Sequence, residues 1–189
     1  DMILQLDSSV NLDIHNNHIL DHRYGFDLNY CDSAQITSNE MISPSSSMFG
    51  DIIRLIRNPN SISTVFEENV FSIETHIESW VYGLLEFNQS EFRNNIINAS
   101  SPSNSGNSAY GLIDADESVI SGNTIQINHY RGAYTRLIKI SGSENNRSVV
   151  ENNTIYAQFH RPTYGGNYDG FYGFITLEGY TDFINNSVT

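Results

Sequence analysis

The sequence is poor in cysteine, proline, positive charge and long apolar runs, and each shortage excludes a class of protein. Its single cysteine, Cys31, rules out a disulfide framework and a zinc site built on cysteines. Nine Lys and Arg against 22 Asp and Glu leave a net charge of -13, which argues against a nucleic-acid-binding protein and against docking on an anionic membrane. No apolar run is long enough for membrane insertion as a transmembrane helix, and no signal-peptide pattern opens the sequence.

Asparagine, serine and isoleucine are abundant instead, with 23, 24 and 22 copies in 189 residues. Together with 10 Phe and 11 Tyr, the isoleucines provide a large core, so we expect an ordered protein rather than a disordered one. The length suits one domain, and we assign residues 1–189 to a single unit. Four prolines and few good helix formers favour β structure.

One short pattern occurs seven times: an apolar residue, two residues, Asn, one residue and a second apolar residue. The asparagines of the seven copies are Asn17, Asn39, Asn69, Asn95, Asn123, Asn153 and Asn186. Successive copies are 22, 30, 26, 28, 30 and 33 residues apart. A turn between two strands favours a residue that tolerates the left-handed conformation, and stacked Asn side chains can hydrogen-bond to one another. We therefore expect an asparagine ladder.

A second pattern precedes most of these copies, namely an aromatic residue, usually followed by Gly, and then an alternating apolar run. Examples begin at Tyr24, Tyr82 and Tyr110. Each unit then holds three short strands, and a unit of 22–33 residues cannot bury its own apolar face. The sequence therefore predicts an all-β, right-handed parallel β-helix solenoid of about seven rungs. Because both ends fall inside predicted strands, we expect a segment of a longer helix, uncapped at both ends.

With these repeats, nearly the whole chain resembles the right-handed parallel β-helix proteins of the pectin-lyase-like superfamily. This resemblance implies a polysaccharide partner and a location outside the cell or on a virion surface. Phage tailspikes of this superfamily are glycosidases with Asp and Glu clusters on one face of the helix. Virion spikes are commonly trimers, so the resemblance also implies a homotrimer.

Stacked rungs bring equivalent outward residues together at the parallel-strand spacing of about 4.8 Å. For the strands after the aromatic residues, the predicted first outward row reads Gln5, Asp27, Arg54, Glu86, Asp114, Lys139 and Thr176. The predicted second row reads Asp7, Asn29, Ile56, Asn88, Asp116, Ser141 and Glu178. Neighbouring carboxylates suit glycosidic cleavage, which needs an acid and a base or nucleophile, and crowding raises the pKa of one of them. Glu86, Asp114 and Asp116 are our candidate catalytic residues.

The loops before these strands are long and rich in aromatic and basic residues, which suits sugar binding by ring stacking and polar contacts. The candidate substrate-binding residues are Arg54, Lys139, Trp80, Tyr130, Arg131, Arg161, Tyr164 and Tyr168. We expect no cofactor and no metal site for a hydrolase.

Two alternatives remain open. In the first, the acidic face is only solvated and the chain is a non-catalytic stalk or adhesin. In the second, residues 137–155 resemble the chondroitinase and alginate lyase branch, which implies a calcium-dependent uronate lyase. Lys139 is the candidate base, although it does not fall where that branch's motif places its lysine, and Asp114, Asp116 and Asn88 offer hard oxygen ligands for calcium. Residues 24–29 are also similar to a mannuronan epimerase signature, but Leu28 and Asn29 replace its Pro and catalytic His.

Overall fold

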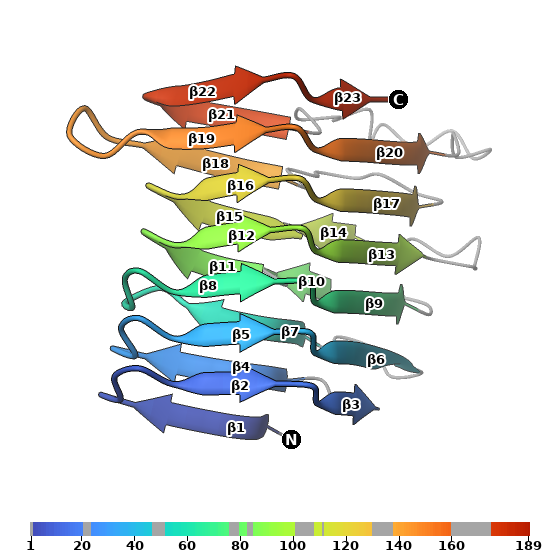
Figure 1. Cartoon of the computed structure of the whole chain (residues 1–189). Coiled ribbons are helices and arrows are strands. Elements are labelled where there is room, and N and C mark those ends of the chain that lie inside the picture. The colour runs from blue at the N-terminus through green and yellow to red at the C-terminus, as the bar shows by residue number, and fades with distance from the viewer. Residues whose placement is uncertain are drawn as a thin grey trace.

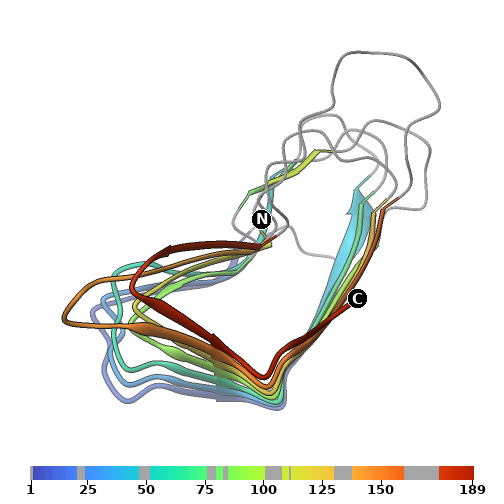
Figure 2. The same cartoon turned by 90° about the horizontal axis from the view of Figure 1, so that it is seen from above.

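A computed structural model describes residues 2–20, 24–46, 52–75, 80–82, 85–100, 108–110, 112–129, 138–159 and 175–189. These residues form strands and turns, with no helix among them, and therefore none that could span a membrane. The strands stack into a parallel β-helix of seven rungs with three parallel sheets (Figure 1). Seen from above, the chain turns counter-clockwise as it rises toward the viewer, so the helix is right-handed (Figure 2). The predicted fold is confirmed.

Each rung contributes one strand to each sheet, and every pairing is parallel. Sheet 1 contains β1 (Met2–Asp7), β4 (Tyr24–Asn29), β7 (Ile52–Asn58), β11 (Leu85–Asn88), β15 (Ile113–Asp116), β18 (Ile138–Gly142) and β21 (Ile175–Gly179), with β10 (Trp80–Tyr82) beside β7 and β14 (Ser108–Tyr110) beside β10. Sheet 2 contains β2 (Asp13–His15), β5 (Gln35–Thr37), β8 (Val65–Glu67), β12 (Glu91–Arg93), β16 (Val119–Ser121), β19 (Ser148–Glu151) and β22 (Thr181–Ile184). Sheet 3 contains β3 (His18–Leu20), β6 (Glu40–Ser46), β9 (Val70–Thr75), β13 (Ile96–Ser100), β17 (Thr124–His129), β20 (Thr154–Phe159) and β23 (Ser187–Val188).

The core lies inside the coil and is filled by alternate residues of all three sheets, because successive side chains of a strand point to opposite faces. Aromatic rings pack at its centre, where Phe87 lies with its ring centroid 5.3 Å from that of Phe92 and 5.6 Å from that of Phe66. Burial of such rings stabilises each rung by about 2 to 3 kcal/mol per side chain. The core therefore depends on neighbouring rungs rather than on any single one.

The predicted asparagine ladder occupies the corner between sheets 2 and 3, and all seven asparagines take part. In each step the side-chain Nδ2 donates to Oδ1 of the asparagine in the next rung, at 2.8–3.1 Å. The Asn95 amide shows the full pattern, since its Nδ2 also donates to the carbonyl of Phe66 and its Oδ1 also accepts the backbone N–H of Asn69. The ladder therefore fixes the relative height of every rung.

The expectation that the ladder asparagines adopt the left-handed conformation of the turn was wrong. The left-handed residue of this turn is the one before each ladder asparagine, as at Ser38, Glu68 and Gly122 with φ of 54°, 55° and 65°. The ladder asparagines have no positive φ, and the five from Asn39 to Asn153 are buried. They are required for hydrogen bonding rather than for the turn's backbone conformation.

A second, shorter polar row lies at the corner between sheets 1 and 2. The buried residues Ser90, Ser118 and Ser148 belong to successive rungs, and the backbone N–H of one donates to the hydroxyl of the next at 3.1 and 2.9 Å. Ser61 has the same role one rung lower, where its hydroxyl accepts the N–H of Cys31 at 2.8 Å. This serine row was not predicted.

Candidate functional site

One outward row of sheet 1 carries the charges that the sequence points to. Its register partners, from rung to rung, are Gln5, Asp27, Arg57, Glu86, Asp114, Lys139 and Thr176. We call this set the charged row. Adjacent members are separated by the strand spacing of about 4.8 Å at the backbone. Six of the seven positions agree with the predicted row.

The exception is β7, where Arg57 takes the position predicted for Arg54. Arg54 instead pairs with Tyr24 at the start of the strand, and its side chain lies outside the described residues. Ile56, predicted to point outward in the second row, is buried in the core beside Leu85. A strand slip of this kind exchanges the inner and outer faces, so the predicted position of Arg54 on the site was wrong.

Two cations neutralise the acids of the charged row. Arg57 lies between Asp27 and Glu86, with nitrogen–oxygen distances of 3.5 and 3.9 Å. The Lys139 ammonium lies 3.7 Å from a carboxylate oxygen of Asp114. Glu86 and Asp114 are therefore neighbouring acids with a cation on either side of the pair. Their side chains are 33% and 47% exposed, so a ligand on this face reaches both.

The third predicted catalytic residue, Asp116, lies two residues after Asp114 on the same strand and belongs to the second outward row. Two residues along a strand correspond to about 6.6 Å. Asp116 pairs in register with Asn88 and accepts a hydrogen bond of 2.8 Å from the Ser141 hydroxyl. The structure thus brings Glu86, Asp114 and Asp116 together on one face.

The predicted aromatic and basic wall cannot be placed in the same way. Trp80 begins β10, whose backbone pairs with β7 and β14, but its side chain lies outside the described residues. Tyr130, Arg131, Arg161, Tyr164 and Tyr168 also lie outside them. The site as described therefore consists of the outward face of sheet 1 and its charged row.

Of the calcium ligands expected for a lyase, Asn88 and Asp116 pair in register, and Asp114 lies two residues before Asp116 on β15. Among the described residues, no group of three or more His, Cys, Asp or Glu side chains lies close enough to hold a metal. Asp114 faces the Lys139 ammonium, and Asp116 is hydrogen-bonded to Ser141. A calcium site, which takes six to eight oxygen ligands, stays a prediction.

A shallow groove of about 480 Å³ lies over the corner between sheets 1 and 2. Val65 and Val119 line it together with polar side chains, among them Gln89, Glu117 and Arg147. Gln89 Nε2 donates to the Glu117 carboxylate at 2.6 Å, and Asn146 Nδ2 donates to it at 2.9 Å. Hydrogen bonds from Ser143, Asn146 and Gln89 lower the pKa of Glu117. No sequence pattern predicts this groove.

The turn 143–147 lies beside this groove, and its last residue, Arg147, anchors it to Asp182 in the next rung. Its guanidinium forms two hydrogen bonds with Asp182, one of them from Nε at 3.0 Å, and lies 5.8 Å from the centre of the Tyr180 ring. The hydrogen bond and charge of Arg147 lower the pKa of the Asp182 carboxyl, and Asp182 raises the pKa of Arg147. These contacts link two successive rungs on the outer surface, where ion pairs contribute little to stability.

No family model, no curated protein sequence and no solved structure matches this chain. The class that the fold defines is the parallel β-helix.

Proposed function

We propose that this protein binds a polysaccharide along sheet 1 and cleaves its glycosidic bonds at the charged row, on a cell or virion surface. The single observation that carries the proposal is the register pairing of Glu86 with Asp114, with Asp116 on the same strand. The likeness of the repeats to the pectin-lyase-like superfamily supports it, because that superfamily includes glycosidases with acidic clusters on such a face.

Asp114 or Glu86 acts as the acid in this proposal and Asp116 as the base. The acid protonates the glycosidic oxygen, and the base takes a proton from the water that attacks the sugar. An acid and base about 6.6 Å apart, as expected for Asp114 and Asp116, suits inversion with a water between them. The closer Glu86–Asp114 pair, at about 4.8 Å along the backbone, suits retention through a covalent intermediate.

The charged row also supports a second candidate, the non-catalytic stalk or adhesin. Glu86 and Asp114 each have a cationic neighbour, and Asp116 has a hydroxyl donor. Acids paired in this way are ordinary on an exposed strand face. The experiment must therefore separate binding from cleavage.

The test is a panel of neutral and acidic polysaccharides incubated with the purified chain, with and without calcium. New reducing ends without ultraviolet absorbance support hydrolysis, and the anomeric configuration of the first product, read by NMR, tells inversion from retention. Ultraviolet absorbance from unsaturated products, if it requires calcium and Lys139, supports the lyase in place of the hydrolase. Binding without either product supports the stalk or adhesin.

Variants of the row make this test specific. We expect Asp114→Asn to lower the cleavage rate by at least about a hundredfold, because general acid–base groups contribute factors of that size. Glu67→Gln is the matched control, since Glu67 is also an ion-paired acid on an outward strand face, 3.1 Å from Arg93 on sheet 2. Equal activity of both variants would contradict the catalytic assignment.

A further inference from the structure

The outward face of sheet 3 over β13, β17 and β20 carries no charge in the described residues, although the protein has a net charge of -13. Its register rows run across the three strands. They are Ile96, Thr124 and Thr154; Asn98, Gln126 and Tyr156; and Ser100, Asn128 and Gln158. We call these nine residues the amide face.

The amides of this face are unbonded among the described residues. Asn98, Gln126, Asn128 and Gln158 have no side-chain hydrogen bond to any described residue, and the last three are exposed. On sheet 1, by contrast, outward polar groups of neighbouring rungs bond to one another, as Asn29 does with Asp7 at 3.1 Å. Within the described residues, these four amides therefore present unbonded donors and acceptors in a regular array.

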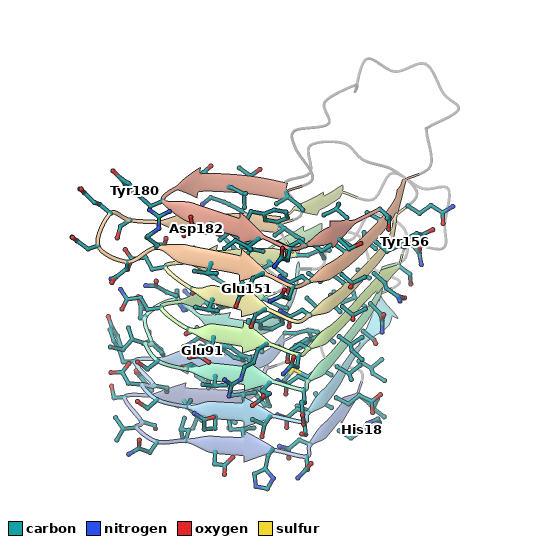
Figure 3. All side chains as sticks on the ribbon, turned by 45° about the horizontal axis from the view of Figure 1, so that its top comes forward. His18, Glu91, Glu151, Tyr156, Tyr180 and Asp182 are labelled. Atoms are coloured by element: carbon teal, nitrogen blue, oxygen red, sulfur yellow. The ribbon has the colours of Figure 1, made fainter. Side chains whose placement is uncertain are left out.

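Apolar surface accompanies these amides. Tyr156 and Ile96 are 44% and 41% exposed, although both are large hydrophobic side chains. Figure 3 shows Tyr156 on the outer side of sheet 3, away from Glu91 and Glu151 on sheet 2. An aromatic ring beside uncharged hydrogen-bonding groups suits the apolar and hydroxyl surfaces of a sugar.

The repeat of the face also has a direction. Each row runs along the helix axis with a step of about 4.8 Å, so a chain laid along the axis meets similar groups at each rung. An amide both donates and accepts, as a sugar hydroxyl does. A ligand without charge needs no ionic partner here, whereas a polyanion finds no cation on this face and is repelled by the acidic protein.

We propose that the amide face binds a neutral polysaccharide along the helix axis. This site is separate from the charged row of sheet 1 and does not depend on cleavage there. The solenoid then binds a neutral polysaccharide on sheet 3, on a different side from the charged row.

The test is affinity electrophoresis and calorimetry of the full chain with soluble dextran, galactomannan and xyloglucan, and with polygalacturonate as the acidic comparison. We expect binding to at least one neutral polymer. Tyr156→Ala should weaken it at least about tenfold, as loss of a central aromatic contact does. The double change Gln126→Glu and Asn128→Asp, which keeps side-chain size and adds charge, should weaken it to a similar extent.

Two controls make the result specific to this face. Gln35→Glu adds one negative charge at an exposed position of β5 on sheet 2 and should leave the affinity unchanged. Glu67→Gln, which removes an acid from β8 on sheet 2, should also leave it unchanged. Absence of binding to all three neutral polymers overturns the proposal. The proposal is also overturned if Tyr156→Ala binds the polymer with the affinity of the wild type. It is overturned too if sedimentation shows that this change only separates self-associated chains.

Discussion

The two corners of the described coil follow different rules. Between sheets 2 and 3, each rung turns with two residues, a left-handed residue and then a ladder asparagine. Between sheets 1 and 2, the turn ranges from the single residue Tyr180 to the six residues 59–64. The first corner has a continuous asparagine ladder, and the second has a shorter row of serines. One corner sets the rung height, and the other accommodates insertions.

This difference shows where variation is tolerated in the solenoid. Insertion of a residue at the ladder would displace a buried amide from both of its neighbours, and buried unpaired amides are costly. At the other corner, the turn 143–147 extends outward and forms its own contacts with Glu117 and Asp182. The charged row and the groove both border this more variable corner.

The largest predicted effect comes from breaking the ladder. Asn95→Ala removes partners from the Phe66 carbonyl, from the Asn69 backbone N–H and side chain, and from one side of Asn123. We expect a loss of about 3 kcal/mol in the free energy of unfolding, because several buried polar groups lose their partners. Urea denaturation measures it. Asn98→Ala is the control, because the Asn98 amide lies on the same rung and has no partner among the described residues. It should change stability by less than about 0.5 kcal/mol.

An opposite change is expected at Asn58, the last residue of β7 beside the variable corner. Asn58 is fully buried and pairs in register with Phe87, and neither amide atom has a hydrogen-bond partner among the described residues. Asn58→Leu should therefore raise the free energy of unfolding by about 1 to 2 kcal/mol, because burial of an unpaired amide is unfavourable. Thermal and urea denaturation test this. A loss of stability would show that the amide has an essential partner.

The repeat was predictable because one pattern specifies two strands and the turn between them. An apolar residue three positions before each asparagine and another two positions after it define the inward faces of sheets 2 and 3. The pairing of Glu86 with Asp114 was predictable for a related reason, since Tyr82 and Tyr110 stand four residues before them.

The position of β7 was not predictable from alternation. Ile52-Ile53 and Leu55-Ile56 offer an apolar residue at either parity, so the sequence allows two registers. The structure places Ile56 inside, and Arg57 joins the charged row. The serine row was also hidden, because four serines at spacings of 29, 28 and 30 do not stand out among 24.

A smaller effect is expected at the serine row. The Ser118 hydroxyl donates to the Asp116 carbonyl at 2.6 Å and accepts the Ser90 N–H. Ser118→Ala should lower the free energy of unfolding by about 1 kcal/mol, clearly less than the ladder change. Urea denaturation measures this loss, and Ser121→Ala, a change at a half-buried serine, is the control. A loss equal to that of Asn95→Ala would contradict the proposed distinction between the corners.

The smallest effect concerns the turn 143–147 and depends on pH. Its hydrogen bonds lower the pKa of Glu117, so the ionised carboxylate stabilises the folded state above its ordinary pKa of 4.5. This contribution is lost as the pH falls through the lowered value. The melting temperature of Glu117→Gln should therefore be slightly below wild type at pH 7 and approach it at pH 3. Glu144→Gln, an exposed change on the same turn that removes the same charge, is the control.

The ladder also has a consequence for how such a protein changes over generations. Each interior asparagine has the same partners in the rungs above and below, so any complete turn can stand next to any other. Duplication or deletion of a gene segment from one asparagine to the next lengthens or shortens the coil and leaves every interior amide bonded. Recombination can thus alter the reach of the protein in whole turns, while each copied turn diverges on its outer surface.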